Sequence, residues 1–123
     1  AIHPNHPEFA DQTNAPVLNG GIVLKFNADL RYTTDGCSAA VVRHFCREAG
    51  INAQNYYNRA DIKGGSTLGH ISAGHLSVSA ADIGLGQLAM HSCYETAGVR
   101  DAADMVALMK AYFTGYSPEI VRN

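Results

Sequence analysis

The stretch that decides the fold is residues 17–26, VLNGGIVLKF, in which an apolar run follows an Asn-Gly-Gly sequence. Glycine tolerates the positive φ angles of tight turns, and short runs of branched apolar residues are typical of strands. The stretch therefore predicts two short β segments joined by a turn at residues 19–21. Lys25 lies inside the second, otherwise apolar segment.

Helical periodicity appears on the C-terminal side of this stretch. In residues 38–49 the apolar side chains recur at helical spacing, and Gly50 is a natural stop for that helix. A glycine-rich loop at residues 64–69 is expected to open a short helix that runs through His75. Asp101 is expected to cap a final helix that extends to about residue 113.

Strands are predicted to alternate with these helices. Residues 51–58 and 76–83 are expected to form short strands, whereas residues 1–16, with three of the four prolines, are expected to be irregular. Strands that alternate with helices predict the α/β class. With 123 residues and 46% hydrophobic content, the chain can bury one modest core, so we expect a single globular unit.

Composition excludes several classes of function. Charged residues make up 16% of the chain and the formal net charge is -2, so no basic stripe is present to bind nucleic acid. The apolar runs are much shorter than the roughly 20 residues that cross a bilayer, so no membrane association is expected. Three widely spaced cysteines predict neither a zinc knuckle nor a disulfide framework, and they favour a cytoplasmic location.

Three features of the sequence are candidates for a functional site. His91 follows a glycine-rich bend after a predicted strand, where α/β sheets tend to place ligands, although a lone histidine is more often a hydrogen-bonded structural residue. The loop at residues 64–69 offers backbone N–H groups to an anion, or is simply a tight turn. Lys25 and Tyr32 could clamp an acidic group, although the default is an exposed lysine and a packed tyrosine.

An ordered series of short motifs runs through the chain. The motifs are IHPN at residues 2–5, VLK and RY at 23–25 and 31–32, NRAD and GSTLG at 58–61 and 65–69, and QLAMHS at 87–92. In this order they resemble the aspartyl aminopeptidase and vacuolar aminopeptidase I family of dinuclear zinc aminopeptidases. The resemblance extends from residue 1 to about residue 113.

The resemblance implies roles for specific residues. His91 matches the histidine that binds the second zinc ion, and Lys25 and Tyr32 match substrate-contacting residues. Residues Gly65, Ser66 and Thr67 match a loop that lines the active site, with only mild departures from the family's Gly-Thr-Thr-Ile-Gly motif. The family's other zinc ligands and its catalytic glutamate match positions upstream of residue 1, so no catalytic residue is expected in this chain.

The resemblance also implies the place of this chain in a larger protein. Residues 1–123 are expected to be a C-terminal portion of a catalytic domain, with a mixed sheet flanked by helices. The N-terminal catalytic part and an inserted dimerisation domain would be absent from the chain, and the missing initiator methionine agrees with this expectation. Family members assemble into tetrahedral dodecamers, so the full protein is expected to form a homo-oligomer.

The expected function is a zinc aminopeptidase that removes acidic N-terminal residues from peptides. Two zinc ions per active site are expected in the full-length protein. Residues 58–61 depart from the family's usual Arg-Asn-Asp pattern, which leaves substrate preference open. The alternatives are an aminopeptidase for neutral residues, or a non-catalytic assembly or binding module that keeps the peptidase fold.

Overall fold

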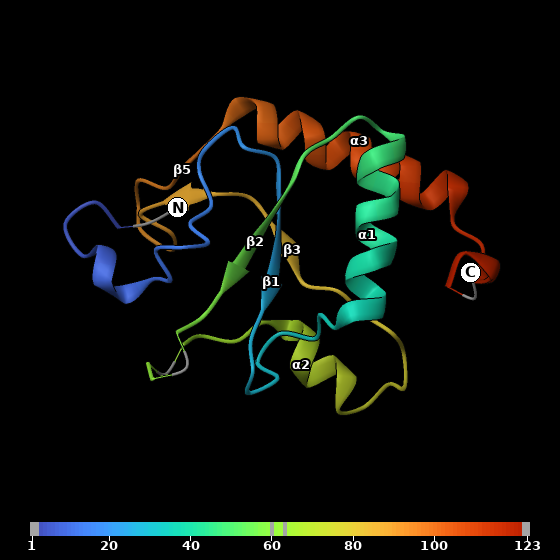
Figure 1. Cartoon of the computed structure of the whole chain (residues 1–123), viewed down its shortest axis with the longest axis horizontal. Coiled ribbons are helices and arrows are strands. Elements are labelled where there is room, and N and C mark those ends of the chain that lie inside the picture. The colour runs from blue at the N-terminus through green and yellow to red at the C-terminus, as the bar shows by residue number, and fades with distance from the viewer. Residues whose placement is uncertain (1–2, 60, 63, 122–123) are drawn as a thin grey trace.

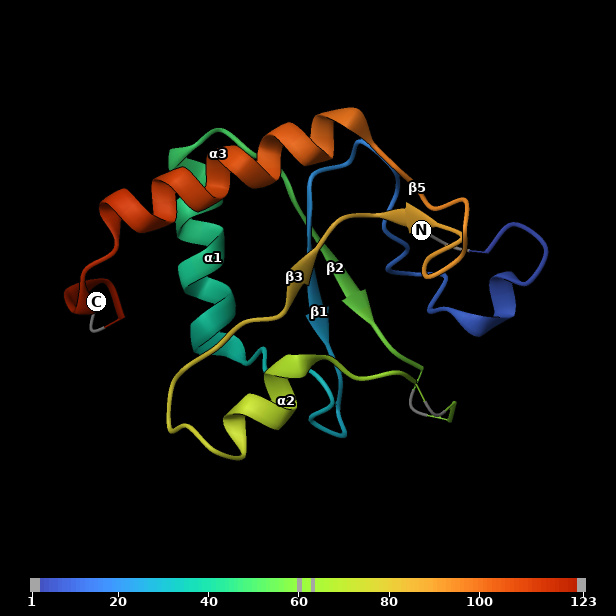
Figure 2. The same ribbon diagram turned by 180° about the vertical axis from the view of Figure 1, so that it is seen from behind.

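The centre of the fold is strand β1 (Ile22–Phe26), which lies in the middle of a three-stranded sheet with the order β2-β1-β3 (Figures 1 and 2). We describe residues 3–59, 61–62 and 64–121 of a computed structural model of the chain. Strand β2 (Ala53–Tyr57) pairs in parallel with β1, and β3 (Ile83–Gly84) pairs with it in antiparallel orientation. The expected mixed sheet is therefore confirmed.

Two helices pack against β1 and against each other. Helix α1 (Gly36–Glu48) connects β1 to β2, and α3 (Val99–Gly115) crosses the C-terminal half of α1 (Figure 2). The core cluster is formed by one strand residue and three helix residues, namely Ile22, Phe45, Cys46 and Leu108. These buried apolar side chains supply the main driving force for joining the layers.

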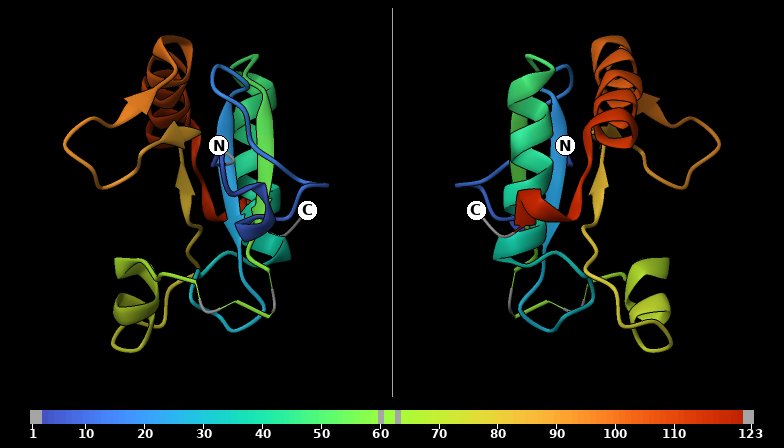
Figure 3. Two further views of the ribbon diagram at one scale, coloured as in Figure 1. Left: turned by 90° about the vertical axis from the view of Figure 1, so that its left-hand side faces the viewer. Right: turned by 90° about the vertical axis from the view of Figure 1, so that its right-hand side faces the viewer.

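Shorter elements complete the chain. Helix α2 (Leu68–Ala73) lies at the end of the sheet opposite α3 (Figures 1 and 3). Strands β4 (Gln87–Leu88) and β5 (Thr96–Ala97) form a separate two-stranded sheet. Single turns of 3₁₀ helix occur at Pro7–Phe9 and Pro118–Val121. Among the described residues, no helix is both long enough and apolar enough to cross a membrane.

Helix α1 shows how local sequence sets its own boundaries. The Ser38 N–H donates to Asp35 Oδ1 over 2.7 Å, and the Asp35 N–H donates back to Ser38 Oγ over 3.0 Å. This capping box lowers the pKa of Asp35 and begins the helix two residues before the predicted start. At the other end Gly50 has φ +67, as expected for the residue that ends a helix.

The predicted hairpin at residues 17–26 is wrong in its first half. Only β1 forms, and residues 17–20 make a turn in which the Gly20 N–H donates to Val17 O over 3.3 Å. The side chain of Gln54 bonds to Val17 instead, accepting from its N–H at 2.9 Å and donating to its carbonyl at 3.1 Å. The backbone groups of Val17 are therefore bonded to a side chain of β2, and the segment before the turn does not pair as a strand.

The predicted strand at residues 76–83 is also largely wrong. Only Ile83 and Gly84 join the sheet, and residues 76–82 are irregular. Residues 79–81 instead line an apolar cavity of about 290 Å³ between α1 and α3. By contrast, the strand expected at residues 51–58 is confirmed as β2, and the short helix after the glycine-rich loop is confirmed as α2, although it ends at Ala73.

Asp101 has a different role from the one predicted. The N-cap of α3 is Gly98, and Asp101 lies in the first helical turn with 0% of its surface exposed. Its carboxylate accepts from the N–H groups of Asn19, at 2.7 Å, and Gly21, at 2.9 Å. In return, Asn19 Oδ1 accepts from the Arg100 N–H at 3.0 Å. The turn before β1 and the start of α3 thus cap each other.

We predict that Asp101→Ala lowers the free energy of unfolding by about 2–4 kcal/mol, because two backbone N–H groups lose a buried charged acceptor. Urea unfolding measures this loss. The matched control is Asp104→Ala on the same helix, which should change the value by no more than about 0.5 kcal/mol. Equal losses for the two variants would contradict the role assigned to Asp101.

Candidate functional site

Two of the residues singled out from the sequence, Lys25 and Tyr32, line one cavity of about 370 Å³. Side chains alternate along a strand, so Val23 and Lys25 lie on the face of β1 opposite Ile22. Lys25 is in register with Tyr56 of β2, which lines the same cavity. The segment between β3 and His91 closes the cavity with Leu85, Gly86, Gln87, Ala89 and Met90.

The side chain of Lys25 is directed by its neighbours. It lies against Gly84 of β3, where an added Cβ would be 3.0 Å from Lys25 Cε and 3.2 Å from Nζ. The ammonium group is 5.9 Å from the centre of the Tyr32 ring, a distance that allows a cation–π contact. No carboxylate within residues 3–59, 61–62 and 64–121 forms an ion pair with Lys25. Its charge is therefore available to an acidic group.

Tyr32 supplies a hydroxyl group that stays protonated. Its side chain is buried, with 9% of the residue exposed, and burial raises its pKa. Burial also raises the pKa of Tyr56, whose ring centre is 6.5 Å from that of Tyr32. Both phenols are therefore neutral hydrogen-bond donors near neutral pH.

The predicted substrate loop lies beside this cavity and does not line it. Gly65 and Ser66 are exposed, and Thr67 is the N-cap residue of α2. The Thr67 N–H donates to Arg31 O at 3.4 Å, which connects the loop to the residue before Tyr32. Thr67 Oγ1 is buried and has no hydrogen-bond partner among the described residues. The loop is thus a neighbour of the cavity, with a buried hydroxyl still able to bond.

His91 lies in the loop between β4 and β5, directly after Met90 of the cavity lining. Its side chain is exposed and its φ of +67 is in the left-handed region. The backbone holds this conformation because the His91 N–H donates to the carboxylate of Glu95 and the Ser92 N–H donates to Ala89 O. The imidazole is therefore exposed to solvent on a loop that these two hydrogen bonds hold in place.

The described residues do not form a complete zinc site by themselves. There, no group of three or more His, Cys, Asp or Glu side chains is placed to hold a metal ion. A zinc site needs three or four ligands, and His91 offers one. The donor set of the described residues therefore does not fit a complete zinc centre.

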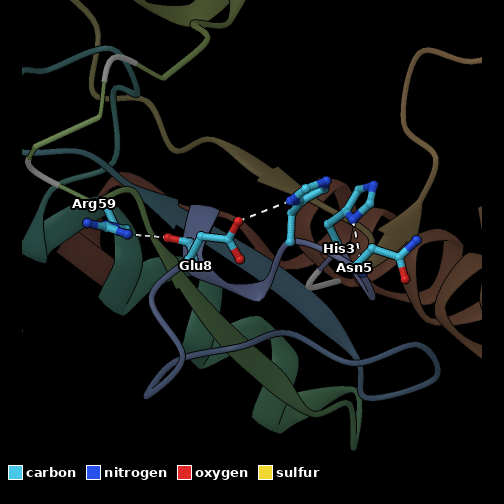
Figure 4. Close-up of polar contacts among 5 residues, drawn as sticks. His3, Asn5, Glu8 and Arg59 are labelled. Carbon is cyan, nitrogen blue, oxygen red and sulfur yellow. Dashed lines mark hydrogen bonds and ion pairs between the residues drawn. The ribbon is translucent and has the colours of Figure 1, made fainter.

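The N-terminal segment brings a further histidine to the cavity. His3 lines it, and its ring centre is 5.0 Å from that of His6. The segment is held by a bond from the Asn5 N–H to His3 Nδ1, by His6 Nδ1 at 3.0 Å from Glu8 Oε1, and by Arg59, which donates to Glu8 O (Figure 4). The first two bonds lie within the segment, and the third links it to Arg59, which follows β2.

Sequence reasoning missed His3, Tyr56 and Met90 as lining residues. His3 belongs to the IHPN motif that carries the family resemblance, which was the available signal for it. Tyr56 could have been found from strand register, because it pairs with Lys25. Met90 adjoins His91 in sequence, which was the available signal for it.

Comparisons with known proteins agree with this arrangement. A family model described as aminopeptidase I zinc metalloprotease (M18) matches residues 1–113. A probable M18 family aminopeptidase 2 from Pseudomonas savastanoi pv. phaseolicola is 40% identical over 115 residues, which are 94% of this chain and 27% of that protein.

Solved structures share the fold. A chain in the cryo-EM structure of the Ape4 and Nbr1 complex is 32% identical with a TM-score of 0.93, over 99% of this chain and 23% of that one. A chain of the S. cerevisiae mApe1 dodecamer is 26% identical with a TM-score of 0.81, over 98% of this chain and 26% of that one.

These likenesses define the class of protein, because the chain shares its α/β fold with zinc peptidases. The chain belongs to the aminopeptidase I zinc metalloprotease (M18) family. The resemblance found in the sequence motifs is thereby confirmed. The chain spans about a quarter of the length of the curated relatives that it matches.

Proposed function

We propose that this chain is a C-terminal portion of the catalytic domain of a zinc aminopeptidase that prefers acidic N-terminal residues. Membership of the M18 family supports peptide hydrolysis. The observation that carries the acidic preference is the position of Lys25, whose ammonium group faces the cavity beside Tyr32 and has no ion-pair partner among the described carboxylates. A carboxylate side chain of a substrate would form a charge-assisted hydrogen bond there.

Each predicted site residue has a proposed role. Lys25 binds the acidic side chain of the substrate, and the neutral hydroxyl of Tyr32 donates a hydrogen bond in the same region. The loop of Gly65, Ser66 and Thr67 is proposed to border the active site beside this pair, without lining the cavity itself. His91 supplies one ligand through a neutral imidazole nitrogen.

The rest of the active site is proposed to come from a part of the protein outside residues 1–123. That part would supply the remaining ligands of two zinc ions and the glutamate that moves the proton. Zinc would polarise the peptide carbonyl when it is bound. We also propose a cytoplasmic homo-oligomer, which the dodecameric assembly of the related mApe1 supports.

A second candidate is a non-catalytic assembly or binding module. The observation that favours it is the lack of a group of three metal ligands within the described residues. A preference for neutral residues is the remaining alternative within the enzyme class, and the variant of Lys25 below separates it from the acidic preference.

In the full-length protein, His91→Ala is predicted to remove one zinc ion per subunit and to lower kcat roughly a hundredfold or more. Mutation of residues that only hydrogen-bond to a metal ligand already costs about 10- to 100-fold, so loss of the ligand itself should cost at least as much. Elemental analysis and steady-state kinetics measure the two effects. His75→Ala, which changes an exposed histidine elsewhere, is the control and should alter neither. Unchanged metal content in His91→Ala would overturn the assignment.

Lys25→Met is predicted to lower kcat/KM for substrates with N-terminal Asp or Glu by about 10- to 100-fold, since a charge-assisted hydrogen bond is lost. Substrates with N-terminal Leu should be affected much less. Lys110→Met, on the exposed face of α3, serves as the control for a lost surface charge. Equal losses for acidic and neutral substrates would show that Lys25 does not read the side chain.

The 123-residue chain by itself is predicted to have no aminopeptidase activity and to bind zinc weakly, because one imidazole cannot hold the metal. Zinc titration and assays with aspartyl and leucyl substrates, run beside the full-length protein, measure this. Tight stoichiometric zinc with turnover in the chain alone would mean that its other histidines or cysteines build a site, and the family-based roles would have to be abandoned.

A further inference from the structure

The placement of Tyr32 relative to Lys25 is not explained by the sheet. Lys25 is held within β1, whereas Tyr32 belongs to the connection of residues 27–35 that leaves β1 before α1 begins. Asn27 Oδ1 organises the first half of this connection by accepting from the Asp29 N–H at 2.8 Å. The second half, which carries Tyr32, needs another anchor to stay beside Lys25.

Asp82 supplies that anchor through its side chain. Its Oδ2 accepts from the Thr33 N–H at 2.7 Å and from Thr33 Oγ1 at 3.0 Å. Hydrogen bonds to a carboxylate are shorter and stronger than those between neutral groups. Residue 33 directly follows Tyr32, so the carboxylate fixes the backbone from which the phenol projects.

The backbone of Asp82 is bonded to β1 at the same point. Its carbonyl accepts from the Lys25 N–H at 2.9 Å, which continues the β1–β3 ladder by one residue. The Asp82 N–H donates to Thr34 Oγ1 at 2.7 Å, and the Thr34 hydroxyl donates in turn to the Asp82 carbonyl at 3.3 Å. One residue is therefore bonded to Lys25 on one side and to the neighbours of Tyr32 on the other.

Helix α2 meets the same pair. A Cβ at Gly69, in the first turn of α2, would be 3.0 Å from Asp82 Oδ2 and 3.2 Å from Thr33 Oγ1, so a larger residue there would have to displace these side chains by a few tenths of an ångström. The Asp82–Thr33 pair is thus the common contact of β1, the Tyr32 connection and the helix that follows Gly65, Ser66 and Thr67.

We propose that Asp82 is a positioning residue for substrate binding, which sets the place of Tyr32 relative to Lys25. The inference rests on the proposed function, because it assigns Lys25 and Tyr32 to substrate. Asp82 does not line the cavity of Lys25 and Tyr32, so it acts through Thr33 and not by touching substrate. Misplacement of a binding group by about 1 Å is enough to reduce catalysis strongly.

A purely structural role for Asp82 makes a different prediction, and Asp101 provides the comparison. Asp101 is also a carboxylate that accepts two hydrogen bonds from a distant loop, but its partners are Asn19 and Gly21 at the start of β1. Loss of either carboxylate should lower stability. Only loss of Asp82 should change substrate binding.

The experiment uses the full-length protein and measures kcat and KM for an aspartyl substrate, with the stability of every variant recorded. Asp82→Ala should raise KM roughly tenfold, and Asp82→Asn, which keeps an acceptor oxygen, should recover most of the loss. Asp101→Ala should lower stability and leave KM within about twofold of wild type. In a Tyr32→Phe background, Asp82→Ala should add little, because the group that it positions is already gone.

A milder variant covers the case in which Asp82→Ala does not fold. Thr33→Val keeps the shape of the side chain and removes only the Oγ1 bond, so KM should rise by a smaller factor in the same direction. Equal effects of Asp82→Ala and Asp101→Ala on KM would overturn the proposal. So would an unchanged KM in both Asp82→Ala and Thr33→Val while Lys25→Met raises it.

Failure of the proposed function is distinguishable from failure of this inference. If Lys25→Met and Tyr32→Phe leave KM unchanged, these residues do not bind substrate and the proposed function of the site fails. Crystal structures of wild type, Asp82→Ala and Thr33→Val then decide the positioning role by themselves. Displacement of Tyr32 relative to Lys25 in the variants supports the role, and an unmoved Tyr32 overturns it.

Discussion

The interaction on which the rest of the structure depends is the buried bond between Asp101 and the turn before β1. A fully buried carboxylate is costly unless it is paired or hydrogen-bonded, and the N–H groups of Asn19 and Gly21 meet that need. Asn19 Oδ1 in turn accepts from the Arg100 N–H at the start of α3. Hydrogen bonds in both directions therefore fix the start of the strand relative to the start of the helix. That position places Ile22 and Leu108 in a common core.

Strand β1 consequently has a polar anchor at each end and apolar packing between them. Asp101 holds the backbone before Ile22, and Asp82 holds the backbone at Lys25. The proposed substrate site lies at the second anchor, where the strand ends and side chains from several segments converge, as is usual for α/β sheets. A rigid strand thus carries the charged residue, while a looped connection carries Tyr32 and depends on Asp82 for its place.

The two halves of the proposed site differ in how complete they are within this chain. Part of the substrate side is in place, because Lys25, Tyr32 and Tyr56 line one cavity, with the loop of residues 65–67 beside it. The metal side is a single exposed imidazole on a braced loop, and a zinc centre needs further ligands. This difference agrees with a chain that spans about a quarter of the length of its relatives. It is also why the proposed activity belongs to the larger protein.

By itself, the sequence determined the elements whose causes are local. Helix α1 follows from apolar spacing, its cap at Asp35 and Gly50, and the ordered motifs identified the family and pointed to Lys25, Tyr32 and His91. Only the tertiary structure decided that residues 17–20 are a turn, that residues 76–82 are irregular and that Asp101 serves a distant loop. The reason is that these outcomes depend on hydrogen bonds between residues 37 to 82 positions apart, which leave no periodic signal in the sequence.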